Sequence, residues 1–427
     1  MDTRLQGLIS FLNGAHSAYH AVEDLVWELE AAGYTCLTEG GAWDLLPGGK
    51  YYLTRGGSTV IAFRIPQDAA TGFLMSASHS DRPGFKIKEN PQLAGAYTRL
   101  AVERYGGMIM HTWTDRPLSV AGRVVVQTAH GVESRLVDID RDLLLIPNVA
   151  IHMNRQVNDG FKWDPRTDVI PLAGDADSKD LFMALLEQEA GGKILGHDLY
   201  LYVRQPACVW GLQEAYLSAA GLDDLECAWC CTRGFLDSRD TEVVPVLCVF
   251  DSEEVGSGSV QGAGSCLLEN VLARICKEMQ WDLDKMLSQS FMVSADNAHA
   301  LHPNHPEFSD SSNAPVMNKG VVVKFNANMR YTTDGVSSGI FRKICQDAGI
   351  PTQTYCNRAD MPGGSTIGCI SMGHVSVPTV DVGLAQLAMH SSYETAGVQD
   401  AGYLMDAMTA YYGTVLETGG DGAYTIR

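Results

Sequence analysis

The sequence lacks several features that mark other classes of protein. In its 427 residues there is no apolar run of about 18 residues or more, the length that a membrane-spanning helix needs. The first residues, Met1 to Leu5, do not combine a basic region with an apolar core, as a secretory signal does. Internal repeats and low-complexity segments are also missing. These absences argue against a membrane protein, a secreted protein and a repeat array, and they favour a cytoplasmic address.

Positive charge is scarce. Lys and Arg together number 31, whereas Asp and Glu number 51, which gives a formal net charge of −20. Because nucleic acid and acidic membrane surfaces would repel such a chain, we expect neither as a partner. The length and the 45% hydrophobic content suffice for a sizeable core and for two domains.

A second paired-cysteine motif is absent, although the chain contains 11 cysteines. Cys227, Cys230 and Cys231 lie close enough together to suggest a zinc ribbon, but no second pair follows them. Buried free thiols along one helix are the favoured interpretation, and they agree with a reducing compartment.

The most informative segment present runs from Val246 to Ser259. An apolar strand leads directly into two adjacent carboxylates, Glu253 and Glu254, and then into a glycine turn. Adjacent side chains at a strand end point in opposite directions, so one could hold a metal while the other handles the proton of a water molecule. A solvated acidic turn is the alternative interpretation.

Four further segments end an apolar run at residues that can ligate a cation. These residues are His79 with Asp81, Asp223 with Asp224, Asp296 with His299, and His390. Histidine nitrogens and carboxylate oxygens are ordinary zinc ligands. They are spread along the chain, and no short His-Glu-x-x-His signature is present, so the fold would have to assemble the site.

Several long motifs resemble those of the M18 aminopeptidases, whose best-known members are the aspartyl aminopeptidases. The motifs are His79-Ser-Asp-Arg-Pro-Gly-Phe-Lys-Ile-Lys, Tyr105-Gly-Gly, His111-Thr-Trp-Thr-Asp-Arg-Pro-Leu-Ser-Val-Ala-Gly-Arg, Asp251-Ser-Glu-Glu-Val-Gly-Ser, Ser294-Ala-Asp-Asn-Ala-His-Ala-Leu-His-Pro-Asn, Met361-Pro-Gly-Gly-Ser-Thr-Ile-Gly, Asp381-Val-Gly and Leu387-Ala-Met-His-Ser-Ser-Tyr-Glu-Thr. They extend from about residue 16 to about residue 400. The resemblance therefore covers nearly the whole chain.

The resemblance implies two divalent metal ions, zinc above all, with cobalt or manganese as alternatives. His79, Asp223 and Asp296 would surround one ion, while Asp223, Glu254 and His390 would surround the other. Glu253 would be the general base that takes a proton from water and returns it to the departing amine.

Two neighbours of the implied ligands also matter. Asp81 would orient the His79 imidazole from behind. Asp223 is followed directly by Asp224 where many relatives have Asn, so either carboxylate could bridge the metals. Alternatively, both acids could simply begin a helix near Leu225, where they would favour the positive end of its dipole.

The resemblance also implies a substrate pocket. Lys324 and His299 would belong to it, and the glycine-rich segment with Met361 and Gly363 would form its wall. Lys324 interrupts an apolar strand, so it either meets a substrate carboxylate or pairs with an internal acid. His152 matches a family histidine that reaches the site of a neighbouring subunit, and a core or surface histidine is the alternative.

Apolar periodicity divides the chain into three parts. Residues 1-90 begin with an amphipathic helix from Ser10 to about Ala32 and continue as strands. Residues 91-214 show short β runs between glycines and charged turns, with one helix at Asp180–Glu189. Residues 215-427 return to alternating strands and helices.

This pattern predicts an α/β fold, a mostly parallel open sheet with helices on both faces that is interrupted by an inserted β-rich domain. Such sheets gather ligands at the carboxyl ends of their strands. The periodicity also predicts a strand at Met108–His111 and a closing helix near Tyr403–Leu416. In the resembling family the insert builds a tetrahedral dodecamer, so a homo-oligomer is implied.

The resemblance and the implied site residues favour a two-metal aminopeptidase that removes N-terminal residues from peptides, with a preference for Asp or Glu. Since the net charge opposes acidic substrates, that preference would depend on local cations such as Lys324. One alternative is a related two-metal carboxypeptidase or amidohydrolase in which Lys324 holds a substrate C terminus. Another is an inactive oligomeric shell protein, although all five implied ligands and the implied base are present.

Overall fold

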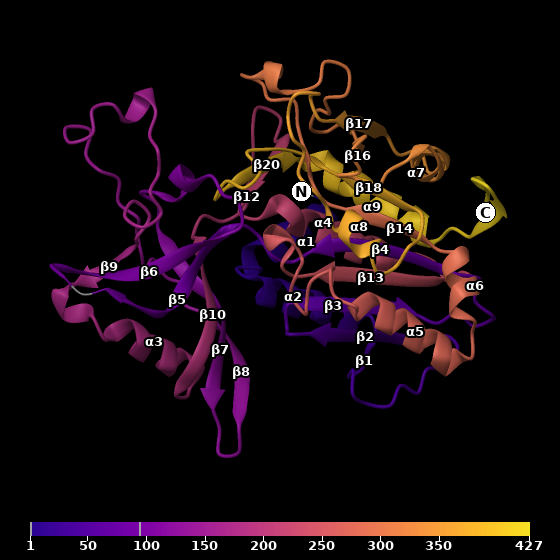
Figure 1. Ribbon diagram of the computed structural model, residues 1–427, viewed down its shortest axis with the longest axis horizontal. Coiled ribbons are helices and arrows are strands. Elements are labelled where there is room, and N and C mark those ends of the chain that lie inside the picture. Colours follow the sequence, from indigo (N-terminus) through magenta and orange to yellow (C-terminus); the bar gives the residue numbers. More distant parts are fainter. Residues whose placement is uncertain (1, 94) are drawn as a thin grey trace.

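The computed structural model describes residues 2–93 and 95–427, and its largest element is a nine-stranded sheet. In spatial order its strands are β1 (Thr35–Cys36), β2 (Lys50–Arg55), β3 (Thr59–Arg64), β13 (Val244–Phe250), β4 (Phe73–His79), β14 (Phe291–Ala295), β18 (Thr379–Gly383), β16 (Val321–Phe325) and β17 (Thr352–Cys356). The central strands β13, β4, β14 and β18 run parallel to one another, whereas β3 is antiparallel to both of its neighbours. The sheet is open and mixed, with the predicted parallel centre (Figure 1).

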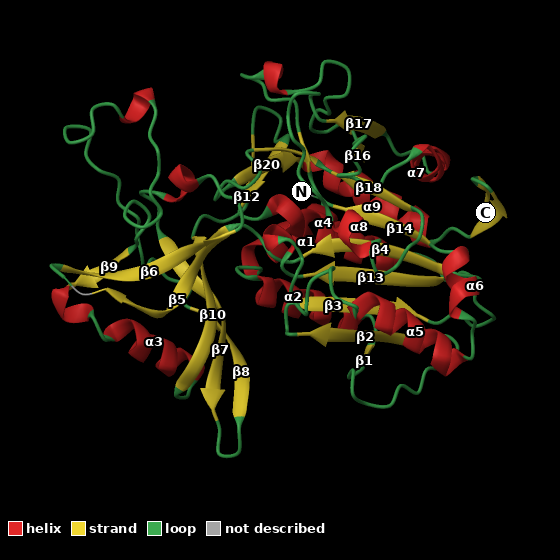
Figure 2. Ribbon diagram, viewed as in Figure 1, coloured by secondary structure: helices red, strands yellow, loops and turns green. Residues whose placement is uncertain are grey.

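Helices cover both faces of this sheet (Figure 2). One face packs against α1 (Thr3–Gly14), α2 (Ala18–Ala31), α4 (Leu222–Asp237), α7 (Gly335–Asp347) and α9 (Val398–Tyr412), and the other against α5 (Leu267–Met279), α6 (Leu283–Ser288) and α8 (Ile367–Ser371). Strand β13 shows why both faces of the sheet need a cover of helices. Leu247 and Val249 point into the first core and Val246 and Cys248 into the second, because successive strand residues face opposite sides. A strand buried on both faces must be apolar throughout, as β13 is.

A second sheet of six antiparallel strands forms a separate layer beside the first (Figure 1). Its strands, in spatial order, are β8 (Val132–Asp138), β7 (Leu118–Gln127), β10 (Ile194–Val203), β5 (Gly84–Leu93), β6 (Tyr97–Tyr105) and β9 (Leu172–Asp175). Helix α3 (Leu181–Ala190) packs against it and supplies Phe182 and Leu186 to its own core. This sheet begins at Gly84, immediately after the turn that follows β4.

The remaining strands are short. A five-stranded sheet contains β11 (Cys208–Trp210), β12 (Tyr216–Ala219), β20 (Glu394–Gly397), β19 (Ala385–Leu387) and β15 (Ala298–His299), and β21 (Leu416–Gly420) pairs with β22 (Ala423–Ile426). Five short 3-10 helices are η1 (Met110–Trp113), η2 (Val157–Asp159), η3 (Ala176–Ser178), η4 (Glu253–Val255) and η5 (Pro306–Phe308). Among the helices of the described residues, none is both long and apolar enough to cross a membrane.

The structure differs from the sequence-based expectations in three segments. The helix expected from Ser10 to Ala32 is two helices, because Ser17 caps α2 by accepting a hydrogen bond from the His20 amide. The Met108–His111 strand is replaced by the 3-10 helix η1. The closing helix ends at Tyr412, and Leu416 already belongs to strand β21.

The cysteine prediction is confirmed. Cys227, Cys230 and Cys231 are buried free thiols along α4.

Candidate active site

The candidate site lies where three neighbouring parallel strands end. His79 is the last residue of β4, Asp296 directly follows β14, and Glu253 and Glu254 form the 3-10 turn η4 after β13. The sheet order β13, β4, β14 brings these strand ends together at one edge, as expected for a ligand site in an open α/β sheet. The fold thus joins residues that are far apart in the sequence.

Asp223 occupies the centre of the cluster. Its Oδ1 atom lies 3.5 Å from Nε2 of His79, and its Oδ2 atom lies 3.3 Å from Nε2 of His390. The same His390 nitrogen lies 3.4 Å from Oε2 of Glu254. One carboxylate with a histidine at each oxygen has the arrangement that a bridge between two cations requires.

Asp223 owes this position to the irregular start of α4. Its φ and ψ of −83° and 106° are not helical, and its amide donates a 3.1 Å hydrogen bond to Glu394. Asp224 points elsewhere, with one oxygen accepting the His79 amide at 3.1 Å. Ligand atoms of Asp223, Asp224 and Asp296 nevertheless lie within 4.8 Å of one another.

Several buried oxygens of the cluster have no hydrogen-bond partner among the described residues. They are Oδ1 of Asp223, Oδ1 of Asp224 and Oε1 of Glu254. Leaving a buried carboxylate oxygen unpaired costs free energy, so these atoms would be stabilised by a cation. The nitrogen and oxygen donors fit the ligand preference of zinc.

The pKa shifts of these carboxylates also indicate that the cluster would be stabilised by cations. Burial raises the pKa of Asp296 to about 6, even though Lys324 opposes the shift. Burial and the Asp223 carboxylate raise the pKa of Glu254 well above its usual value. Burial also disfavours the charged form of Asp223, but the neighbouring His390 and His79 imidazoles outweigh it and lower the pKa of Asp223. Cations between these acids would favour the ionised form of all of them.

Asp81 organises the cluster from behind. Its Oδ1 atom lies 3.3 Å from Nδ1 of His79 and accepts the Glu253 amide at 3.1 Å, and its Oδ2 atom accepts the Glu254 amide at 3.2 Å. The hydrogen bond at Nδ1 of His79 goes to the Asp81 carbonyl oxygen, 3.0 Å away, and a partner on the far nitrogen of a ligating histidine fixes the direction of the ring. Asp81 therefore orients one predicted ligand and holds the backbone of the η4 turn.

Glu253 faces the open side of the cluster. Together with the predicted ligands it lines a pocket of about 310 Å³. Burial, followed by the carboxylates of Asp296 and Asp223, raises the pKa of Glu253 to about 7, although His79 opposes the shift. A carboxylate with a pKa near neutrality can both accept and return a proton at the pH of the cell.

The opposite wall of this pocket includes Lys324 and His299, as predicted. Lys324 is 1% exposed, and its Nζ atom donates to the carbonyls of Asp296 at 2.6 Å and Asn297 at 3.3 Å. It also lies 3.8 Å from Oδ1 of Asp296. Backbone carbonyls thus solvate the ammonium and the Asp296 carboxylate pairs with it, which is the internal-acid pairing that the sequence left open as the alternative.

Some predicted residues lie outside this pocket. His152 is exposed on the long connection between β8 and β9 of the second sheet. In the glycine-rich segment, Gly364, Ser365 and Thr366 line the pocket, while Met361 and Gly363 precede them in the chain.

Sequence reasoning missed several lining residues, namely Gly256, Asn297, Ala298, Tyr331 and Met389. Met389 could have been found, since it precedes His390. Tyr331 carried no sequence signal, and its position over Lys324, 5.1 Å from Nζ to the ring centroid, comes from packing.

Comparison with known proteins identifies the family. A family model described as aminopeptidase I zinc metalloprotease (M18) matches residues 11–412. The chain belongs to the M18 family. A probable M18 family aminopeptidase 2 of Clostridium novyi is 38% identical over 421 residues, which cover 95% of this chain and 97% of that protein. A protein of the same description from Pseudomonas aeruginosa is 39% identical over 419 residues, which cover 95% and 97%.

Solved structures of M18 proteins share the fold. A chain in the cryo-EM structure of the Ape4 and Nbr1 complex has a TM-score of 0.93 at 35% identity, with 96% of this chain and 85% of that chain covered. The S. cerevisiae mApe1 dodecamer has a TM-score of 0.84 at 26% identity, with 96% of both chains covered. The protein is therefore a metalloaminopeptidase of a zinc-dependent family.

Proposed function

We propose that this M18 metalloaminopeptidase binds two divalent ions and removes acidic residues from peptide N termini, with Glu253 as its general base. The observation that carries the proposal is Asp223, whose two oxygens face His79 and His390. His79 and Asp296 would hold one ion and Glu254 and His390 the other, with Asp223 shared. When bound, the ions supply Lewis-acid polarisation of the peptide carbonyl and make water more acidic.

The protein's own residues would divide the remaining work. Glu253 accepts a proton from the attacking water and then donates it to the amine that leaves. Asp81 keeps the His79 ring and the η4 backbone in place during both transfers. The peptide would approach these groups through the pocket of about 310 Å³ that they line.

Preference for acidic residues would come from Lys324. Besides the proposed metal ligands, the basic side chains that line the pocket are Lys324 and His299. Burying an ammonium is costly unless an anion meets it, and here the Asp296 carboxylate lies 3.8 Å away while the carbonyls of Asp296 and Asn297 accept from Nζ. Because Asp296 would also ligate a metal ion, a substrate carboxylate at that wall would serve as a second anion for the ammonium.

We further propose that the chain works as a homo-oligomer, as the mApe1 dodecamer does. The connection that carries His152 is exposed, and its neighbours Ile151 and Met153 are 48% and 84% exposed. Large apolar side chains with that exposure are typical of surfaces that pack against another subunit. His152 would then reach the pocket of a neighbour.

Hydrolysis of a panel of aminoacyl chromogenic substrates, with and without added zinc, cobalt or manganese, tests the activity. We expect metal-dependent release of Asp and Glu over Leu and Ala. The same panel with blocked N termini is the control, because an aminopeptidase requires the free amine. Hydrolysis confined to the blocked substrates would contradict the proposal, and so would preferential release of C-terminal residues.

A further inference from the structure

Residues 105–112 connect the second sheet to the candidate active site. They start at the end of β6 and run into η1, so they belong to the chain of the inserted sheet rather than to that of the nine-stranded sheet. Tyr105-Gly-Gly stands out in the sequence, but neither the proposed ligands nor the proposed base gives it a role. Its contacts suggest one.

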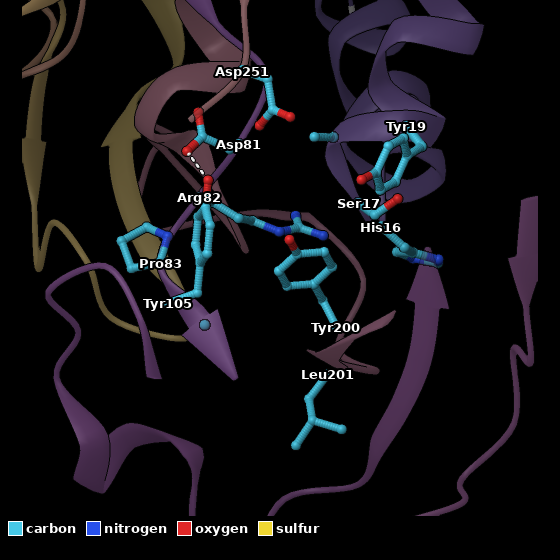
Figure 3. Close-up of a pocket in the computed structure, with 12 residues that line it drawn as sticks. His16, Ser17, Tyr19, Asp81, Arg82, Pro83, Tyr105, Tyr200, Leu201 and Asp251 are labelled. Carbon is cyan, nitrogen blue, oxygen red and sulfur yellow. Dashed lines mark hydrogen bonds between the residues drawn. The ribbon is translucent and has the colours of Figure 1, made fainter. Parts of the chain in front are cut away.

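Tyr105 reaches the carboxylate that organises the cluster. Its hydroxyl donates a 2.7 Å hydrogen bond to Oδ2 of Asp81, the oxygen that also accepts the Glu254 amide. Figure 3 shows this bond beside a small cavity of about 30 Å³. The start of α2, the loops that follow β4 and β13, and the second sheet line the cavity, and the Tyr105 ring packs edge-on against Tyr200 of β10, with centroids 5.4 Å apart. The inserted sheet thus holds Tyr105, and Tyr105 holds Asp81.

Gly106 packs directly on a proposed metal ligand. A Cβ atom at this position would lie 3.2 Å from both Cβ and the carbonyl oxygen of Glu254, and the backbone has a φ of +71°. A larger residue would be strained in this conformation and would push against Glu254. The glycine therefore permits the close approach of the two segments.

The same segment also fixes the loop that carries His390. The amide of Ile109 donates to the carbonyl of His390 at 3.0 Å. Two residues later in that loop, the Ser392 amide donates to Oγ1 of Thr112 at 2.9 Å, and the Ser392 hydroxyl donates to the Thr112 carbonyl at 2.6 Å. Hydrogen bonds at the ligand itself and two residues after it leave its loop little freedom to shift.

We propose that residues 105–112 are a positioning segment through which the inserted domain sets the geometry of the metal site. Tyr105 acts through Asp81 on His79 and the η4 turn, Gly106 acts on Glu254, and Ile109 and Thr112 act on the His390 loop. This inference rests on the proposed function, since it assumes that these residues are ligands. It makes the inserted domain a part of the active site, in addition to any role in assembly.

Zinc titration calorimetry of the metal-free full-length protein tests the inference without requiring activity. We expect Tyr105→Phe, which keeps the ring and removes the hydroxyl, to weaken zinc binding by about 10-fold to 100-fold, the usual effect of losing a group behind a metal ligand. Gly106→Ala is expected to weaken chiefly one of the two binding steps, because it presses on Glu254. Tyr97→Phe is the matched control, since Tyr97 starts the same strand and is 58% exposed.

Two further measurements separate positioning from folding and from the proposed function. The thermal midpoint of metal-free Tyr105→Phe should match that of the metal-free wild type, and the zinc concentration for half-maximal hydrolysis should rise. Zinc affinities within twofold of the wild type in both Tyr105→Phe and Gly106→Ala would overturn the inference. A wild type that binds two zinc ions but releases no N-terminal residue would instead refute the proposed function and leave the positioning role of residues 105–112 intact.

Discussion

The two walls of the candidate pocket are built differently. On the metal side, His79 and Asp223 are 1% and 3% exposed, and strand ends, the Asp81 carboxylate and the start of α4 fix each group. On the substrate side, Gly364, Ser365 and His299 are exposed, and Lys324 is the one buried cation among the residues that line this pocket. The comparison suggests that the chemistry is set by a rigid frame, while selectivity depends on very few side chains.

Loss of the base should have the largest effect on turnover. For Glu253→Gln we expect kcat to fall by a factor on the order of 10² or more, since the amide cannot accept a proton. Stopped-flow or steady-state hydrolysis of an Asp substrate measures the effect. Zinc content should stay that of the wild type, because Glu253 is not a proposed ligand, and full activity of this variant would remove Glu253 from the mechanism.

Removal of the metals should make the stability of the folded protein sensitive to pH. Burial raises the pKa of Asp296 to about 6 and that of Glu253 to about 7, above the value of about 4 for an exposed carboxyl. The folded state then holds protons that the unfolded state has lost, so stability is greatest below about pH 4 for these groups and falls as the pH rises to about 7.

Differential scanning calorimetry after chelation measures this dependence. We expect the metal-free protein to lose stability, on the order of a few kcal/mol, between about pH 4 and about pH 7. Bound zinc should abolish most of this dependence of stability on pH. A metal-free protein that becomes more stable over this range would show that the carboxylates are already paired without cations.

Selectivity should depend on Lys324. We expect Lys324→Met to lower the ratio of kcat/KM for Asp over Leu substrates by about 10-fold to 100-fold, the value of a hydrogen bond to a charged group. Lys343→Met on α7 is the matched control, since the Lys343 side chain is 54% exposed. An equal loss of kcat/KM for both substrates would instead mean that Lys324 holds Asp296 in place.

The smallest expected effect concerns His152. In His152→Ala we expect a loss of kcat of only a few-fold to about 10-fold, with the oligomer intact by light scattering, because a positioning contact from a neighbour would be lost. His130→Ala, another exposed histidine of the inserted sheet, is the control. Unchanged turnover within an intact oligomer would mean that His152 does not reach the pocket.

The strands of the large sheet could be predicted because they are buried on both faces and therefore read as continuous apolar runs. The run Phe291–Ala295 forms strand β14, and the residues that follow such runs are the ones that gather at the sheet edge. Local capping was harder to see. Ser17 divides one apolar periodicity into two helices, although the pattern of buried residues continues across the break.

What the sequence could not show is the contribution of distant packing. Nothing in the Asp223-Asp224 pair decides which carboxylate faces both histidines, since the kink at the start of α4 determines it. The role of Tyr105 likewise depends on the inserted sheet lying beside β4. Periodicity describes one element at a time, whereas these contacts join elements that are remote in the sequence.

Zinc stoichiometry per folded chain tests the central claim most directly. Mass spectrometry under native conditions, or metal analysis after dialysis, should find two zinc ions in the wild type and in the matched variant Asp224→Asn, and fewer in Asp223→Asn. One ion or none in the wild type, or two ions retained in Asp223→Asn, would contradict the shared centre around Asp223.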